Sequence, residues 1–248
     1  MNLNGLRILN TRPRDQSLDL SQAIHDAGGV SIDLPALAIE PTADVWLKNL
    51  PDLTRTHHAI FISTNAVNYF FTAVSTEQFT WPRTIQTTAV GKATARALEK
   101  WGVHVDHIPP IANSEHLLQL ESLKQVLNQT ILWVKGEGGR IDIPHALRTR
   151  GAQLISLDVY RRVLPNKTPQ HVYSLWHDDV VDIILLTSQQ AMHNLFTLLG
   201  VEAHPWLRKT PCIVISERLA QEASRLGMQN IMVCRYDTIL NTLAQRLR

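Results

Sequence analysis

The sequence predicts an α/β protein of two similar domains, each a parallel sheet covered by helices. Three observations support this fold class. Apolar runs alternate with amphipathic stretches, much of this pattern repeats after 125 residues, and two extended segments end in proline. With 248 residues, of which 44% are hydrophobic, the chain is long enough to bury a core in each domain.

The alternation consists of short apolar runs, each followed by a helical stretch that ends near glycine. This is the pattern of βαβ units. The first run, "LRILN", leads into "SLDLSQAIHDAGG". The other five strand-like runs are residues 58–63, 86–91, 130–136, 181–188 and 211–216.

The repeat aligns the middle of the chain with its C-terminal part. "AIFISTNAV" at 59–67 overlays "ILLTSQQAM" at 184–192, and "TAVGKATARALEKWG" at 88–102 overlays "IVISERLAQEASRLG" at 213–227 without a gap. A third correspondence, shifted by two residues, lays "LSQAIHDAGGVSIDLP" on "IPHALRTRGAQLISLD". The counterpart of "TILWVKGEGGR" is "LRILNTRPRD" at the start of the chain, so we expect the first βα unit to belong with the C-terminal half.

This arrangement requires the chain to cross between domains twice. Residues 30–41 and 153–165 suit the crossings, because both are extended in composition, lack helical spacing and end in proline. We therefore expect an antiparallel pair of linker strands. The predicted boundaries are 1–33 and 166–248 for domain 1, 42–153 for domain 2, and 34–41 and 154–165 for the linker strands.

Composition excludes several classes of function. The net charge of +2 falls far short of the basic excess of a protein that holds a nucleic-acid backbone. No window approaches a membrane span, and no export signal is present, so we expect a cytoplasmic protein. Cys212 and Cys234 fit no zinc pattern and indicate buried apolar residues in a reducing compartment. Neither a metal site nor a covalent nucleophile is indicated.

Candidate site residues lie in the loops that follow the predicted strands. Ligands of open α/β sheets bind beyond the carboxyl ends of the strands, where helix N-termini favour anions. We expect these loops to face a cleft that holds a sizeable polyanion. The candidates are Arg12, Ser63, Asn65, Gly91, Thr94, Lys135, Gly136, Gly138, Gly139, Arg140, Thr187, Ser188, Gln189, Ser216 and Arg218.

Each candidate also has a purely structural interpretation, and the residues alone leave both open. Ser63, Ser188 and Ser216 would serve equally well as helix N-caps. "KGEGGR" fits neither a Walker loop nor GxGxxG and would serve as a plain turn from strand to helix. Arg12 would be a surface cation beside a helix start, and Tyr160 a packing aromatic with a solvated hydroxyl.

An ordered set of motifs resembles the uroporphyrinogen-III synthase family over essentially the whole chain. The motifs, in order, are "TRP", "FISTNAV", "AVGKATARAL", "SEHLLQL", "KGEGGR" with "LRTRGA", "VYRR", "LLTSQQAM" and "VISERLAQEASRLG". The set is specific, although no single motif is. The sequence departs from the family pattern at Lys135, where arginine is frequent, at Ile62, where threonine is common, and in "SERLA", which replaces "GxxTA".

The resemblance implies two flavodoxin-like domains joined by a two-stranded ladder, and an enzyme without a cofactor. Such an enzyme cyclises hydroxymethylbilane, a linear polycarboxylate tetrapyrrole, to uroporphyrinogen III with loss of water and inversion of ring D. The resemblance points to Tyr160 as the proton donor to the leaving hydroxyl. The glycines would expose backbone donors, while Arg12, Lys135 and Arg140 contribute charge. We expect a monomer that receives its substrate by transient handover from hydroxymethylbilane synthase.

Two rival functions remain to be distinguished. A two-lobed protein that binds a small polar ligand without transforming it would be expected to carry an export signal or a DNA-binding segment, and neither is visible. A nucleotide-dependent α/β enzyme is disfavoured because the sequence lacks GxGxxG and its acidic partner.

Overall fold

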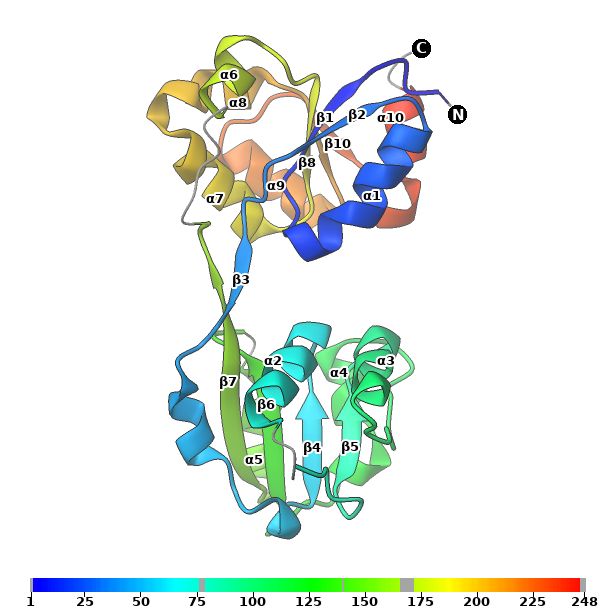
Figure 1. The fold of residues 1–248 in the computed structure, drawn as a ribbon, viewed down its shortest axis with the longest axis vertical. Helices are drawn as coiled ribbons and strands as arrows, with labels where there is room; N and C mark the ends of the chain where they lie inside the picture. Colours follow the sequence, from blue (N-terminus) through cyan, green and yellow to red (C-terminus); the bar gives the residue numbers. More distant parts are fainter. Residues whose placement is uncertain (1, 76–78, 140, 166–171, 246–248) are drawn as a thin grey trace. The chain divides into compact units, whose positions relative to one another are not determined.

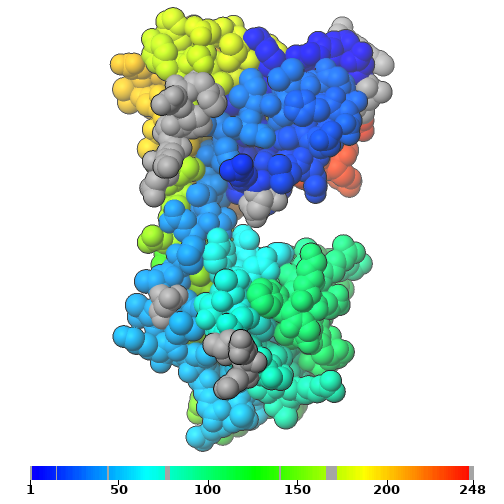
Figure 2. Space-filling model, in the orientation of Figure 1, coloured from blue at the N-terminus to red at the C-terminus, as the bar shows by residue number. Residues whose placement is uncertain are grey.

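The computed structural model describes residues 2–75, 79–139, 141–165 and 172–245. The chain divides into two compact units (Figure 1). Unit 1 comprises Met1–Ile39 and Val163–Arg248, and unit 2 comprises Glu40–Arg162. Figure 2 shows that unit 1 combines both ends of the chain, because blue N-terminal and yellow-to-red C-terminal residues lie together on its surface.

Unit 1 is built on a five-stranded sheet in the order β10-β9-β8-β1-β2, and its described strand pairs are all parallel. The strands are β1 (Arg7–Asn10), β2 (Val30–Asp33), β8 (Ile183–Leu186), β9 (Cys212–Val214) and β10 (Ile231–Val233). The helices are α1 (Arg14–Asp26), α6 (Val172–His177), α7 (Gln189–Leu199), α8 (His204–Lys209), α9 (Glu217–Arg225) and α10 (Ile239–Gln245), with 3-10 turns η4 (Val201–Ala203) and η5 (Tyr236–Thr238).

Alternate strand residues of unit 1 feed two cores, one on each face of the sheet. Ile184 and Leu186 pack in a cluster with side chains of α7, α8 and α9. Ile183 and Leu185 pack in a second cluster with side chains of α1 and α10. Burial on both faces explains why the strands of this sheet read as continuous apolar runs.

Unit 2 contains a second five-stranded sheet, in the order β3-β7-β6-β4-β5. The strands are β3 (Ala38–Pro41), β4 (His58–Phe61), β5 (Gln86–Ala89), β6 (Thr130–Gly136) and β7 (Gln153–Val163). The helices are α2 (Thr64–Val74), α3 (Lys92–Lys100), α4 (Ser114–Leu118) and α5 (Asp142–Thr149), with 3-10 turns η1 (Asp44–Asn49), η2 (Leu53–Arg55) and η3 (Glu121–Leu123). One face packs Ile60 and Ile131 against α4 and α5, and Phe61 contacts an aromatic cluster on the other.

The internal repeat is realised element by element. Helices α2 and α7 begin and end at residues 125 apart, and so do α3 and α9. The order β5-β4-β6-β7 in unit 2 matches β9-β8-β1-β2 in unit 1. A single parallel bridge, Thr88 to His107, flanks β5 at the place that β10 takes beside β9. Unit 1 therefore has the flavodoxin strand order, and the predicted fold class of two α/β domains with parallel sheets is confirmed.

Both crossings between the units fall within strands. The chain leaves unit 1 between Ile39 and Glu40, within β3, and returns between Arg162 and Val163, within β7. Strands β3 and β7 are neighbours in the sheet of unit 2.

The first of these strands begins at Ala38, four residues later than the expected start at Leu34. The intervening segment is instead held by unit 1. The amide of Leu34 donates to the carbonyl of Asn10 at 3.0 Å, and the Asn194 side chain donates to the carbonyl of Ala36 at 2.7 Å. Hydrogen bonds to residues distant in sequence thus set where the strand starts.

Candidate functional site

The strand-end loops gather at one edge of each sheet, because parallel strands end on the same side. In unit 1 this edge, the unit 1 rim, consists of residues 11–13, 187–189 and 216–218, which follow β1, β8 and β9. In unit 2 the corresponding unit 2 rim consists of residues 63–65 and 91–94, which follow β4 and β5, and residues 135–139, which comprise the last two residues of β6 and the turn after it. Every predicted site residue lies on a rim except Tyr160, which is in β7, and Arg140, which falls outside the described residues.

The rims include the points where the order of strands reverses. In unit 1 the reversal lies between β1 and β8, so Arg12 and Ser188 follow adjacent strands. In unit 2 it lies between β4 and β6, so Ser63, which follows β4, and Lys135, near the end of β6, belong to adjacent strands. Ligands of doubly wound sheets bind at such switch points.

The three predicted serines are all helix N-caps. The Oγ atoms of Ser63, Ser188 and Ser216 accept hydrogen bonds from the backbone N–H three residues on, at 3.0, 3.1 and 3.4 Å. The structural interpretation of these residues is therefore correct. It does not exclude ligand binding, because a capping hydroxyl uses its oxygen as acceptor and keeps its hydrogen for donation. All three side chains are half-buried.

The remaining helix-start candidates differ in exposure. Thr94, in the first turn of α3, is only 4% exposed, which leaves little of its side chain accessible. Gly91, the N-cap of α3, has an extended φ of −170° and presents backbone rather than a side chain. Gln189 and Arg218 are exposed, and Asn65 and Thr187 are half-buried.

Lys135 holds its own loop together. Its ammonium forms an ion pair with Asp158 on β7 and donates to the carbonyls of Gly136 and Gly138 at 3.1 and 3.0 Å. Gly138 and Gly139 have φ values of +72° and +93°, so the turn uses the left-handed region that glycine tolerates. Much of the positive charge of Lys135 is therefore neutralised within the unit 2 rim.

Arg12 contrasts with Lys135. Its guanidinium lies 4.6 Å from the ring centroid of Tyr236, and its Nη2 approaches Gln16 at 3.4 Å. The Nε atom is buried and has no hydrogen-bond partner. No acidic side chain that the structure describes lies within ion-pair distance of Arg12, so its charge is available to an anion.

Tyr160 is packed inside unit 2 and does not match the alternative of an aromatic with a solvated hydroxyl. Its side chain is 1% exposed, and its ring stacks on Tyr69 with centroids 6.1 Å apart. The hydroxyl lies 3.2 Å from Ser63 Oγ and accepts from Arg162 Nη2 at 3.2 Å. A Cβ on Gly136 would lie 2.5 Å from the ring, so only glycine fits there.

Sequence reasoning missed several residues that contact the candidates, among them Tyr236, Asp158 and Arg162. Arg162 was accessible to such reasoning, because side chains two apart in a strand share a face and β7 contains both Tyr160 and Arg162. The contact of Tyr236 with Arg12 spans most of the chain, and no local pattern signals it.

The structure offers little for metal or thiol chemistry at the rims. Among the described residues, no group of three or more His, Cys, Asp or Glu side chains is arranged to hold a metal ion. Both cysteines are free, and burial raises the pKa of Cys212 to about 11, which keeps this thiol protonated at neutral pH. None of the described helices is long and apolar enough to cross a bilayer.

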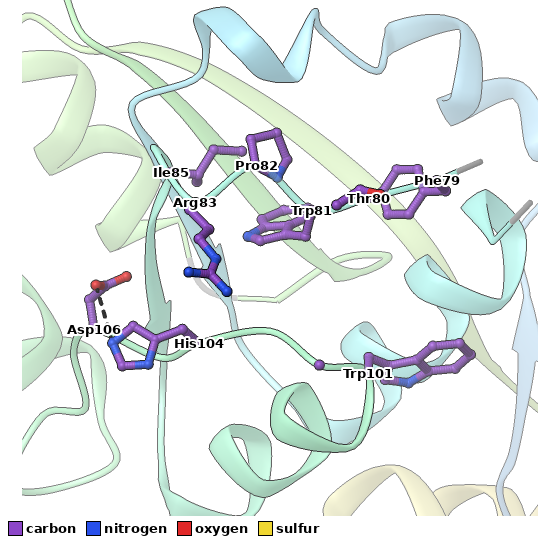
Figure 3. Close-up of a pocket in the computed structure, with 10 residues that line it drawn as sticks. Phe79, Thr80, Trp81, Pro82, Arg83, Ile85, Trp101, His104 and Asp106 are labelled. Carbon is purple, nitrogen blue, oxygen red and sulfur yellow. Dashed lines mark ion pairs between the residues drawn. The ribbon is translucent and has the colours of Figure 1, made fainter. Parts of the chain in front are cut away.

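A pocket of about 630 Å³ lies at the other end of the unit 2 sheet (Figure 3). Residues 79–85, which precede β5, and residues 101–106, which follow α3, supply its lining. Figure 3 shows the indole of Trp101 apart from the pair formed by His104 and Asp106, whose atoms are 3.7 Å apart. None of the described lining residues is a predicted site residue, so this pocket is separate from the unit 2 rim.

Comparisons with known proteins agree with one another. The model of a family described as uroporphyrinogen-III synthase HemD matches residues 19–240. The chain is 28% identical to the uroporphyrinogen-III synthase of Escherichia coli K12 over 233 residues, covering 92% of this chain and 94% of that one. It is 29% identical to the protein of the same name from Chlorobaculum parvum over 197 residues, covering 78% and 79%.

Solved structures show the same fold. The uroporphyrinogen-III synthetase of Helicobacter pylori 26695 superposes with a TM-score of 0.65 at 16% identity, covering 98% of this chain and 100% of that one. A mutant uroporphyrinogen III synthase from the extremely thermophilic bacterium Thermus thermophilus superposes with a TM-score of 0.62 at 15% identity, covering 98% and 97%.

Proposed function

Because the chain belongs to the uroporphyrinogen-III synthase family, we propose that it converts hydroxymethylbilane into uroporphyrinogen III. The reaction is a cyclisation with loss of water, so the enzyme is a lyase of tetrapyrrole biosynthesis. The observation that carries the proposal, beside the family match, is the pair of matching rims. Each offers helix N-termini with hydroxyl and backbone donors at a switch point, which suits a substrate with many carboxylates.

The chemistry requires positioning more than a strong catalyst. Loss of the ring-A hydroxyl gives an azafulvene, which ring D attacks through its substituted α-carbon to form a spiro-pyrrolenine. Fragmentation and reclosure then leave ring D inverted. Pyrrole electrons drive each step, and the free substrate closes without inversion. The protein must therefore hold the chain for attack at the substituted carbon, which is a matter of orientation and electrostatic stabilisation.

Several groups share the binding of acetate and propionate side chains in this proposal. On the unit 1 rim, Arg12 supplies a cation without an acidic partner among the described side chains, and Ser188 and Ser216 supply hydroxyl donors. On the unit 2 rim, Ser63 supplies a hydroxyl, and Gly138 and Gly139 supply exposed backbone. Asn65, Gly91, Thr94, Thr187, Gln189 and Arg218 complete the proposed set.

Lys135 shapes its loop, while Tyr160 assists protonation of the leaving hydroxyl. If Tyr160→Phe retained full turnover, the acid role of this residue would be lost. We further propose that β3 and β7 form the linker between the units. A monomeric cytoplasmic enzyme that receives its unstable substrate from hydroxymethylbilane synthase completes the proposal.

The test is an assay with freshly generated hydroxymethylbilane in which type I and type III isomers are separated after oxidation. We expect the protein to give the type III isomer and the blank without protein to give type I. Type I alone in both samples would overturn the proposal. It would favour the rival function, a two-lobed protein that binds a polar ligand without transforming it.

A further inference from the structure

We infer that Arg162, Tyr160 and Ser63 form a directional hydrogen-bond chain whose outer end, the Ser63 hydroxyl, delivers the proton to the leaving group. The inference rests on the proposed function and deepens it. Arg162 is a positioning residue in this hydrogen-bond chain, Tyr160 is the buried proton source, and Ser63 contacts the substrate at the leaving hydroxyl rather than at a carboxylate.

The direction of the chain follows from the chemistry of its first member. A guanidinium has only donors, so the 3.2 Å contact from Arg162 Nη2 makes the Tyr160 oxygen an acceptor. The phenol hydrogen then points to its other neighbour, Ser63 Oγ, at 3.2 Å. Ser63 Oγ also accepts from the amide of Ala66 at 3.0 Å. With both lone pairs engaged, the Ser63 hydrogen is left to donate away from the chain.

Burial separates the proton source from the group that touches the substrate. The Tyr160 side chain is 1% exposed, whereas Ser63 is half-buried on the unit 2 rim. The tyrosine ring is also fixed in place. The main chain of Tyr160 is held because its carbonyl accepts from the amide of Glu137 at 2.8 Å, and the ring packs between Tyr69 and Gly136, where a Cβ would lie 2.5 Å from it. A ring held in this way cannot swing its hydroxyl outward, so a proton from Tyr160 passes through Ser63.

The charge of Arg162 suits a transient phenolate. Its guanidinium carbon lies 5.4 Å from the Tyr160 ring centroid, and its Nη2 contacts the phenol oxygen directly. The leaving ring-A hydroxyl takes a proton from Ser63 and departs as water, while Ser63 takes the proton of Tyr160. The phenolate beside Arg162 is reprotonated through Ser63 by the proton that ring D loses when the macrocycle closes. One water is released, and the protein ends each turnover with its original protons.

The neighbouring arginine provides a matched control. Arg161 lies one residue away on β7, so its side chain points to the opposite face of the strand. There its Nη2 meets Glu40 Oε2 at 3.5 Å. Arg161→Met therefore removes an arginine from the same strand without disturbing the hydrogen bonds among Arg162, Tyr160 and Ser63.

A double-mutant cycle tests the inference, with kcat and KM measured on freshly generated hydroxymethylbilane for Arg162→Met, Tyr160→Phe and the double variant. We expect each single change to lower kcat roughly tenfold or more with little change in KM, as for groups that act in proton transfer. The double variant should be no slower than Tyr160→Phe alone, because Arg162 acts through the phenol. Arg162→Lys, which keeps a cationic donor, should recover part of the loss, and Arg161→Met should keep wild-type kcat.

The inferred hydrogen-bond chain would be overturned if the losses in kcat multiplied in the double variant. Wild-type kcat for Arg162→Met would overturn it as well. Equal loss in Arg162→Lys and Arg162→Met would also count against it, because the donor would then be irrelevant. Failure of the proposed function looks different, because the wild-type protein would then yield no type III isomer. Far-UV circular dichroism and the Tm of each variant establish that it is folded.

Discussion

The two units share one framework but treat the same cation position differently. The pairing of β1 with β2 begins at Arg7 and Val30, and the equivalent pairing of β6 with β7 begins at Thr130 and Gln153. Arg12 and Lys135 each lie five residues after the first paired residue of β1 and β6, so they occupy equivalent positions. Lys135 is neutralised by Asp158. Arg12 rests on an aromatic ring and meets no acid among the described side chains. Equivalent positions in duplicated units have thus been given different electrostatic roles.

The capping serines differ in the same sense. Ser63 and Ser188 are 125 residues apart and cap equivalent helices, but only Ser63 has a phenol as a second partner among the described residues. Tyr160 lies thirty positions after Thr130. The residue thirty positions after Arg7, its counterpart in unit 1, is the buried Leu37. Under the proposed function, this difference predicts that unit 1 contributes charge to binding, whereas unit 2 contributes the hydroxyl groups that move a proton.

The largest expected effect comes from closing the space that Tyr160 occupies. In Gly136→Ala, the new methyl group would lie 2.5 Å from the tyrosine ring, which must shift. Overpacking of this kind costs about 1–3 kcal/mol of stability, or several degrees in Tm. We expect kcat to fall at least ~10-fold because the hydroxyl leaves Ser63. Adding Tyr160→Leu should recover Tm but not kcat. A fully active Gly136→Ala enzyme would show that the fixed ring is not needed.

The cation position gives the next largest contrast. We expect Arg12→Gln to raise KM roughly tenfold with little change in kcat, because a charge-assisted contact contributes about 1.5–3 kcal/mol. Lys135→Gln should change KM less, since its charge is already neutralised, and should instead lower the urea midpoint because it leaves Asp158 without its cation. Equal increases in KM for the two variants would contradict the division of roles.

The matched serines sharpen the comparison further. Ser63→Ala and Ser188→Ala each remove an N-cap, and both should lower the free energy of unfolding by about 1 kcal/mol. Beyond that shared cost, we expect kcat to fall only for Ser63→Ala, whereas Ser188→Ala should act on KM. Denaturant titration measures the first effect and steady-state kinetics the second. A drop in kcat that is equal in both variants would place the proton donor elsewhere.

The smallest expected effect concerns pH. His58 begins β4 where unit 1 has Ile183, and desolvation by burial is the main cause that lowers the pKa of His58. Because the unfolded chain binds this proton more readily, the contribution of His58 to stability is fully present above pH ~6.5. This contribution is lost as the pH falls through the lower pKa of the folded state. His58→Ile should therefore flatten the pH dependence of the urea midpoint between pH 7 and 5. An unchanged slope would point to other groups.

The sequence was sufficient to predict the framework of the fold. The 125-residue repeat aligned the sequence of α2 with that of α7, and α3 with α9. It did so because a helix N-cap and the apolar spacing of a helix are local features. Local features did not predict where the first linker strand begins, since its start depends on hydrogen bonds from Asn194 and to Asn10.

The candidate site was predictable as a set of loops but not as a set of contacts. That strand-end loops meet at one edge follows from parallel pairing alone. Whether Lys135 points to a ligand or to Asp158 depends on a side chain on another strand, and the same holds for Arg12 and Tyr236. Patterns along the chain contain no information on such pairings.

The insertion of unit 2 between the two segments of unit 1 has a consequence for synthesis on the ribosome. Unit 2 is one continuous stretch, so its sheet can be complete before the last third of the chain has been translated. Strand β1, in contrast, emerges first and waits for its partner β8 until some 170 residues later. We therefore expect the nascent protein to fold from its middle outward, with its first strand among the last to complete its pairing.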